Sequence, residues 1–97
     1  MITDLQQMII DELTENSNKI SPKFINNLVV MSSVQYLHPT PNMRLCIITL
    51  PTGHEVLGKA QVLDVANDDE DIGNKVALTN ATNEIWALVG SIAKLHV

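Results

Sequence analysis

Cysteine, aromatic and basic residues are all scarce in this chain of 97 residues. A single cysteine, Cys46, excludes a disulfide within the chain and favours a reducing compartment. Aromatics make up only 3% of the residues, so the core must be built from Ile, Leu, Val and Ala. A domain of this size buries about 60–65% of its unfolded surface. Such a thin core predicts a homo-oligomer.

Positive charge is also limited, with six basic residues against eleven acidic ones and a net charge of −5. The cations are scattered, and Arg44 is the only arginine. Direct nucleic-acid binding is disfavoured, because tracking a phosphate backbone needs clustered cations. No secretory leader is recognised, and no apolar run approaches the roughly 18 residues that a membrane span needs. We therefore expect a cytoplasmic protein without a membrane partner.

The C-terminal third carries the strongest pattern, which predicts one long amphipathic helix from Asp68 to His96. The apolar positions that recur at three- and four-residue steps are Leu78, Ala81, Ile85, Leu88, Ile92 and Leu95. This face is widened by further apolar residues, namely Val76, Ala77, Trp86, Val89 and Ala93, which predicts packing on a sheet. Asn67 or Asp68 is the expected N-cap, and Gly90 is a candidate kink or break.

The N-terminal third predicts two shorter helices. The first spans Ile2 to Glu15, where Thr3 and Gln6 have the spacing of a capping box. The second runs from Pro22 to about Val30. Ser21 supplies a hydroxyl N-cap for it, and proline at the first helical position is favourable.

The middle of the chain changes to a strand pattern. Residues 34–38 form an expected first strand, and the two prolines in residues 39–42 predict a connector. Met43 to Leu50 is apolar and β-branched, as expected for a central buried strand. Residues 51–53 predict a hairpin turn, and His54 to Leu63 the third strand.

These elements predict a single α+β domain over residues 1–97. It comprises a helical N-terminal extension (1–31), a three-stranded antiparallel β-meander (33–63) and a long C-terminal helix (68–96) packed on the sheet. Gly58, inside the third strand, predicts either a β-bulge or the close approach of another backbone.

Several of these segments together match a known signature. They are Arg44–Leu50, Gly53, Val56, Gly58, Asp69–Gly73 and Asn83–Trp86. Over about residues 34–95 the chain resembles the gene 49 / gene 66 family of small tailed-phage proteins. Ala87 stands where that family often has proline, so the helix is expected to continue there.

The resemblance implies a phage accessory protein that acts in the cytoplasm of the infected host. It supplies no catalytic residues to carry over. Small phage proteins of this type are often host-takeover or anti-defence factors, which is an association and not chemistry.

The residues themselves assemble no metal-ligand spacing and no nucleophile–base pair, so we expect neither an enzyme nor a cofactor. Three candidate binding features remain. The first is the acidic helix start, which comprises Asp68, Asp69, Glu70 and Asp71. The second is a polar strip beside Trp86, which comprises Asn80, Asn83 and Glu84. The third is a place for an anionic ligand where Gly58 lies beside Arg44 and Lys59.

Three functions fit these features. The first is a non-enzymatic inhibitor that docks on a host protein through the acidic helix start or an exposed sheet edge. The second is a sponge that sequesters a small signalling nucleotide at an oligomer interface. The third is a structural or assembly role in the virion. Scarce cations favour the first over the second.

Overall fold

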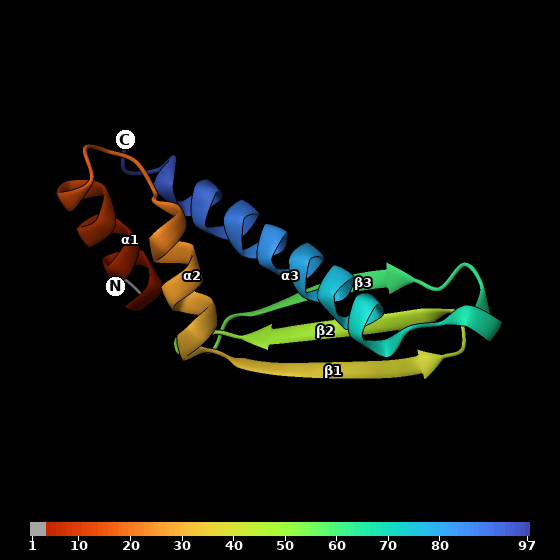
Figure 1. Ribbon diagram of the computed structural model, residues 1–97. Helices are drawn as coiled ribbons and strands as arrows, with labels where there is room; N and C mark the ends of the chain where they lie inside the picture. Colours follow the sequence, from red (N-terminus) through yellow and green to blue (C-terminus); the bar gives the residue numbers. More distant parts are fainter. Residues whose placement is uncertain (1–3) are drawn as a thin grey trace.

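The computed structural model describes residues 4–97 and confirms the α+β class (Figure 1). Its elements are α1 (Asp4–Glu15), α2 (Pro22–Met31), β1 (Ser33–Thr40), β2 (Met43–Thr49), β3 (Glu55–Gln61), the short 3₁₀ helix η1 (Val65–Asn67) and α3 (Glu70–Ala93). The predicted helix start at Ile2 and the capping role of Thr3 lie outside the described residues. The Ser21 N-cap is confirmed, since its Oγ accepts a hydrogen bond from the Phe24 N–H at 3.1 Å.

The three strands form an antiparallel sheet in the order β1-β2-β3. Cys46, in the central strand, lies opposite Tyr36 on β1 and Gly58 on β3. The buried residues of β2 alternate along the strand, and they face α3. Side chains on the intervening positions therefore point to the other face of the sheet.

The predicted end of the first strand before Pro39 is wrong. β1 continues through Pro39 to Thr40, with a shift of register between Leu37 and Thr40. The proline is tolerated because it lies within this register shift of an edge strand, where it has no partner on β2. The connector is therefore a turn at residues 41–42.

Helix α3 lies across one face of the sheet and packs mainly on β3 and β2 (Figure 1). The predicted apolar face of α3 is largely confirmed, because Ala81 and Ile85 are buried and Leu78, Leu88 and Ile92 pack against the core as partly buried residues. The buried residues recur every four positions and are Ala77, Ala81, Ile85, Val89 and Ala93. Leu95, expected on this face, is 75% exposed and lies beyond the end of the helix.

Gly58 explains why small residues occupy that face. A Cβ at Gly58 would overlap the backbone carbonyl of Ala77 and the backbone amide of Ala81. The close-approach interpretation is therefore confirmed. The β-bulge interpretation is wrong, because the β2–β3 register runs without a shift from Met43 to Thr49. The small side chains of Ala77 and Ala81 leave room for a helix this near a strand.

The ends of α3 also differ from expectation. The N-cap is Asp69, whose Oδ1 accepts a hydrogen bond from the Ile72 N–H at 3.1 Å, and not Asn67 or Asp68. Asn67 is the last residue of η1, and Asp68 is the C-cap of η1. Gly90 causes no break, since α3 continues to Ala93, and the helix also passes through Ala87 as expected.

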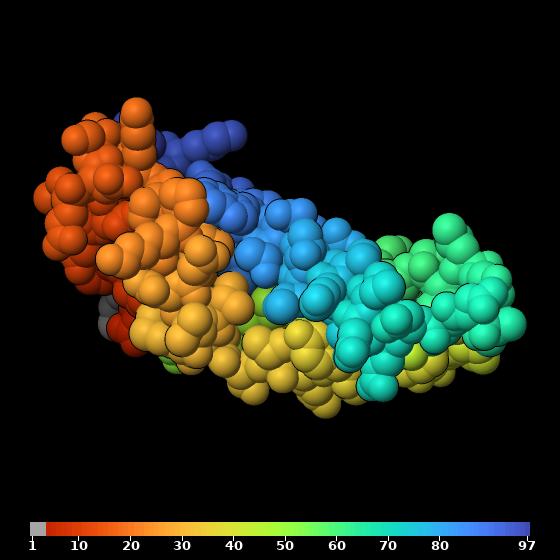
Figure 2. Space-filling model, in the orientation of Figure 1, coloured from red at the N-terminus to blue at the C-terminus, as the bar shows by residue number. Residues whose placement is uncertain are grey.

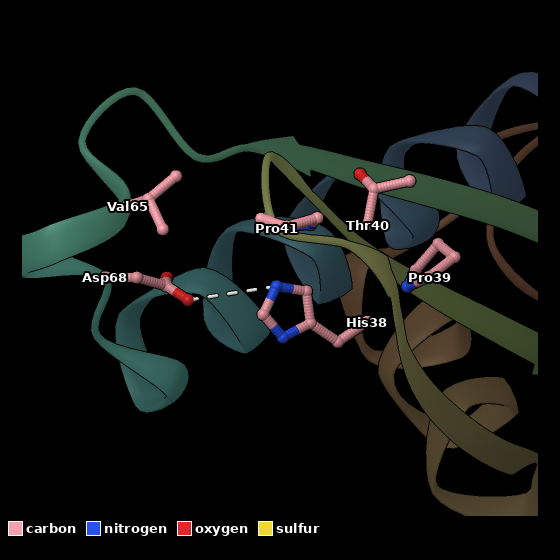
Figure 3. A pocket seen from close by; sticks show the side chains of 6 residues that line it. All are labelled: His38, Pro39, Thr40, Pro41, Val65 and Asp68. Carbon is pink, nitrogen blue, oxygen red and sulfur yellow. Dashed lines mark ion pairs between the residues drawn. The ribbon is translucent and has the colours of Figure 1, made fainter.

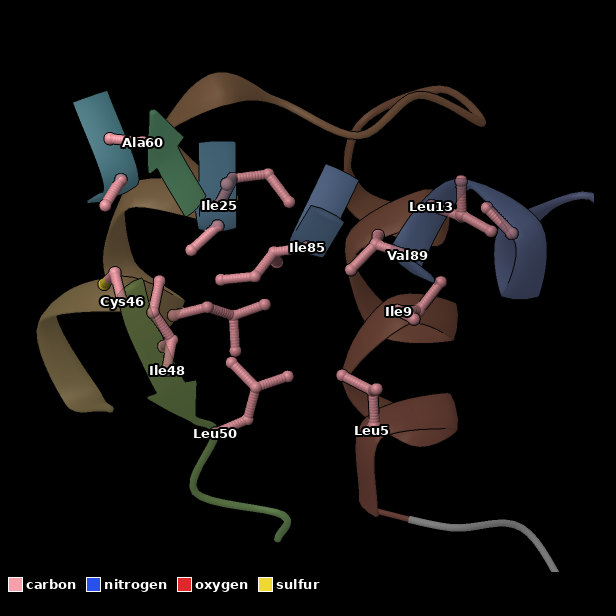
Figure 4. Packing of buried hydrophobic residues seen from close by; sticks show 14 residues of the cluster. Leu5, Ile9, Leu13, Ile25, Cys46, Ile48, Leu50, Ala60, Ile85 and Val89 are labelled. Atoms are coloured by element: carbon pink, nitrogen blue, oxygen red, sulfur yellow. The ribbon is translucent and has the colours of Figure 1, made fainter. Parts of the chain in front are cut away.

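Helices α1 and α2 enlarge the core at one end of the molecule, where they pack on α3 (Figure 4). Leu5 and Ile9 of α1 join Ile25 of α2 and Ile85 and Val89 of α3 in a single apolar cluster. The molecule is elongated, about 49 × 23 × 20 Å (Figure 2). Helices α1 and α2 occupy one end, and the β1–β2 turn and η1 occupy the other (Figure 1).

Candidate functional site

Strand β3 is an edge strand of the sheet. Two hydrogen bonds, one at each end of the strand, show which of its residues bond to β2 and which point outwards. The Leu50 N–H donates to the His54 carbonyl at 2.7 Å, and the Val62 N–H donates to the Asn42 carbonyl at 2.7 Å. In an antiparallel pair, main-chain hydrogen bonds are made at every second residue, so the even-numbered residues of β3 make the hydrogen bonds to β2. The odd-numbered residues, among them Leu57, therefore direct their N–H and C=O groups away from the sheet.

Helix α3 follows this edge along most of its length, from Ile72 to Ser91, and leaves a row of hollows beside it. Three hollows of about 450, 550 and 290 Å³ lie between β3 and α3 or their flanking segments. The middle hollow is lined by Leu57, Gly58, Lys59, Asn80, Asn83 and Glu84. It shares Leu57 and Glu84 with the first hollow. We call this row, with the outward edge of β3, the β3 edge groove.

Asn80 connects the two sides of the β3 edge groove. Its Nδ2 donates a hydrogen bond of 2.7 Å to the Lys59 carbonyl, which is one of the outward-pointing groups. The remaining outward groups of Leu57 and the Lys59 N–H face the groove. The polar strip predicted from Asn80, Asn83 and Glu84 thus lies beside an open strand edge.

The groove is predominantly acidic. Glu55 and Glu84 line its first hollow, and Asp64 and Asp69 line its third, whereas Lys59 is the one cation among the lining residues of the three hollows. Opposite charges favour association and set the orientation of a partner. An extended segment with basic side chains is therefore complementary to this groove.

The opposite edge of the sheet is less suited to pairing. Pro39 removes a main-chain donor from β1, and the register shift before Thr40 twists that strand. Strand β3 contains no proline and keeps a regular register over its whole length. Of the two sheet edges, β3 is the one left available to another strand.

Arg44 does not face an anion-binding site. It is 8% exposed, and its guanidinium donates to both carboxylate oxygens of Asp68, from Nε at 3.1 Å and from Nη2 at 2.6 Å. This hydrogen bonding raises the pKa of Arg44 and lowers the pKa of Asp68. Strand alternation directs the Lys59 side chain to the opposite face of the sheet from Arg44, although Lys59, at the edge, also lines the middle hollow. The predicted grouping of Arg44 and Lys59 around Gly58 is therefore wrong.

The acidic helix start does not form one patch. Asp68 is paired with Arg44, and Asp69 caps α3 through its side chain. Glu70 and Asp71 are exposed in the first turn, where the helix dipole favours negative charge. Half of the acidic cluster is thus used to attach α3 to the sheet and to begin the helix.

His38 adds a feature that the sequence did not indicate. Its Nε2 lies 3.9 Å from an Asp68 carboxylate oxygen, beside a hollow of about 460 Å³ (Figure 3). Pro39, Thr40, Pro41 and Val65 form the rest of the lining. The sequence did not predict this contact, because the first strand was expected to end at His38. An expected strand end gave no reason to place His38 near Asp68, at the start of α3.

Two further residues are placed away from the groove. Trp86, 37% exposed, lies about 100° around α3 from buried Ile85, on the side opposite Glu84. It therefore does not share the hollow of the polar strip. Cys46 is buried, and burial raises the pKa of its thiol, which keeps it protonated. Within residues 4–97, no three His, Cys, Asp or Glu side chains are grouped so that they could hold a metal ion.

These features define a small α+β domain in which a long helix covers one face of a meander and one strand edge stays accessible. The chain belongs to the phage protein (N4 Gp49/phage Sf6 gene 66) family, which it matches over residues 13–97. The match confirms the family resemblance and begins earlier than expected, so that it includes all of α2. No curated protein and no solved structure matches the chain. No helix within residues 4–97 is long and apolar enough to cross a membrane.

Proposed function

We propose that this phage protein is a non-enzymatic accessory protein that binds an extended, basic segment of a host protein at the β3 edge groove. The observation that carries the proposal is the regular outward edge of β3 beside an acidic groove. Addition of a strand to an open sheet edge is a common mode of peptide recognition. Binding in the host cytoplasm would let the protein act as a host-takeover or anti-defence inhibitor.

The geometry divides affinity and selectivity between the two sides of the groove. Outward main-chain groups of β3 can pair with any extended backbone, at about 0.5–1.5 kcal/mol for each hydrogen bond. Side chains of α3 then distinguish partners, since Glu84 favours a basic residue and Asn83 offers an amide. Selectivity therefore depends on α3, and the general capacity to bind depends on β3.

The two alternatives receive less support. A nucleotide sponge needs cations around its ligand, whereas Arg44 is occupied by Asp68 and Lys59 shares its hollow with Glu84. A virion role would be revealed by mass spectrometry of purified particles, in which the protein would be abundant. Neither alternative uses the open edge of β3.

The test is affinity capture from the infected host with two groove variants. Leu57→Pro removes an outward N–H and so blocks strand addition without removing a β2–β3 hydrogen bond. Glu84→Arg reverses a charge in the groove. Glu15→Arg is the matched control, because Glu15 is exposed at the end of α1.

We expect a host protein that is retained by the wild type and the control and lost from both groove variants. Circular dichroism should show that the variants remain folded. A host protein captured equally by all four proteins would contradict the proposed site.

A further inference from the structure

One flank of α3 lies beside the outer edge of β3, and its side chains change character along the helix. Ile72, Val76, Asn80 and Glu84 follow one another at four-residue steps, which places them on the same side of the helix. Each of them lines at least one of the three hollows of the β3 edge groove. We call these four residues the α3 flank. From the start of the helix it presents two aliphatic side chains, an amide and an acid.

The aliphatic end of the α3 flank is exposed to solvent. Ile72 is 62% exposed and Val76 is 44% exposed. Leu63, which lines the same hollow, is 91% exposed. Removing such aliphatic surface from water is favourable in proportion to the area that a ligand covers. This end of the groove is therefore suited to an apolar side chain.

The two ends of the α3 flank also differ in the charge that they offer to a ligand. The carboxylates that line the third hollow are used within the fold, since Asp64 caps η1, Asp68 forms an ion pair and Asp69 caps α3. At the other end, Glu55 and Glu84 line the first hollow, and the described residues around it include no lysine or arginine. This end is therefore suited to a basic side chain.

The close approach at Gly58 shows how residues of β3 match residues of α3 along the groove. Gly58 lies against the backbone of Ala77 and Ala81. Two residues along a strand span about 6.6 Å, and four residues along a helix span about 6 Å. Strand and helix run in opposite directions here (Figure 1). Each two-residue step back along β3 therefore matches a four-residue step forward along the α3 flank.

This correspondence places two residues of β3 level with the two ends of the α3 flank. Ala60 lies level with Ile72 and Val76, and Val56 lies level with Glu84. The linings of the hollows agree, because Ala60 shares the third hollow with the two aliphatic residues and Val56 shares the first hollow with the acid. The two matched positions are four residues apart on β3.

We infer that the β3 edge groove selects an extended segment in which a basic residue follows a large apolar residue by four positions. The inference rests on the proposed function and adds the direction and the sequence of the ligand. Antiparallel pairing is the more stable per residue, and it makes the ligand run from Ala60 towards Val56. Side chains of directly opposed residues point to the same face of a sheet. The ligand residues opposite these two positions therefore both point towards α3, one to the aliphatic end and one to Glu84.

Asn80 leaves the strand edge able to accept this ligand. Its Nδ2 occupies one acceptor position of the Lys59 carbonyl, at 2.7 Å, and a carbonyl oxygen has two lone pairs. The second lone pair can accept a main-chain N–H of the ligand. The amide oxygen of Asn80 can accept a hydrogen bond from a hydroxyl group on the ligand residue opposite Gly58. Serine or threonine midway between the apolar and the basic residue is therefore favoured.

Nuclear magnetic resonance titration of the full chain with synthetic peptides tests this inference. Three peptides of about nine residues carry one leucine and one arginine in a background of serine and threonine. In the first peptide the arginine follows the leucine by four positions, in the second by three, and in the third it precedes the leucine by four. The first should bind at least about tenfold more tightly than the others, because only it places both side chains against the α3 flank in the antiparallel direction.

Two variants test the two ends of the α3 flank separately. Glu84→Arg should reverse the charge preference, so that a peptide with glutamate in place of the arginine binds more tightly than the first peptide. Ile72→Ser should bind the first peptide at least about threefold more weakly than the wild type. Glu15→Arg, at an exposed position of α1, is the control and should bind all three peptides like the wild type.

Equal binding of the three peptides, or tighter binding of the second or the third, would overturn the inference. So would an unchanged charge preference in Glu84→Arg. The proposed function is judged by a separate variant, Leu57→Pro. If the three peptides bind equally and all are lost from this variant, strand addition at β3 stands without the sequence preference. If no peptide binds the wild type at about 5 mM, both the preference and the strand addition are contradicted.

Discussion

Gly58→Ala should separate α3 from the sheet. The added methyl group would overlap the Ala77 carbonyl and the Ala81 amide, which are backbone atoms and cannot rotate away. The helix would therefore have to move from β3, its main contact. Overpacking of a core typically costs about 1–3 kcal/mol, and we expect the upper end because no side chain can yield.

The expected loss is a large share of the total stability. A domain of this length has a free energy of unfolding of about 5–15 kcal/mol. A loss of about 3 kcal/mol should lower the melting temperature by about 12–24 °C, since each kcal/mol shifts it by about 4–8 °C. Urea unfolding and thermal melting, both followed by circular dichroism, measure these two quantities.

Gly90→Ala provides the matched control in the same helix. A Cβ at Gly90 meets no atom within 4 Å, and the position is helical. The variant should be stabilised by up to about 1 kcal/mol, because alanine is the better helix former. Destabilisation of Gly58→Ala by less than about 1 kcal/mol would refute the close-packing argument.

Two further predictions concern the contacts that hold the helices in place. The Arg44 hydrogen bonds lower the pKa of Asp68 in the folded state, so this carboxylate contributes stability above its unfolded pKa of about 3.9 and loses it as the pH falls through the lower folded value. Asp68→Asn should therefore destabilise the protein most near neutral pH. Urea unfolding at several pH values should show that the difference in unfolding free energy between wild type and variant shrinks below about pH 4. A difference in unfolding free energy that stays constant with pH would contradict this. Ser21→Ala should cost about 1–2 kcal/mol, because the Ser21 hydroxyl both caps α2 and donates a hydrogen bond to Glu12. Thermal melting unchanged from the wild type would show that these bonds contribute nothing.

Periodicity was sufficient to predict the elements and their order, because each helix and strand carries its own local pattern. It predicted the buried face of α3 broadly, since Ala81 and Ile85 are buried, but not that alanines form the part closest to the sheet. Leu78 and Leu88 are more apolar than Ala77 and Ala81, yet the backbone approach at Gly58 admits only the small residues. Hydropathy alone cannot register such a steric requirement.

The candidate site was only partly predictable for a related reason. Asn80, Asn83 and Glu84 stand out on a polar strip of a helix, and their spacing shows that they lie together. Whether they face the edge of β3 depends on how α3 lies across the sheet, which no local pattern determines. The pairing of Arg44 with Asp68 joins residues far apart in the chain and likewise needed the tertiary structure.

The accessible edge of β3 is the central claim, and amide hydrogen exchange tests it most directly. The exchange of Leu57 and Lys59 should be compared in the free protein and in the complex with the captured host protein. Strand addition predicts that both outward amides exchange quickly in the free protein and are protected in the complex, whereas the amide of Gly58, already paired with β2, changes little. Unchanged exchange at Leu57 and Lys59, with protection elsewhere on the surface, would show that the host protein binds another part of the molecule.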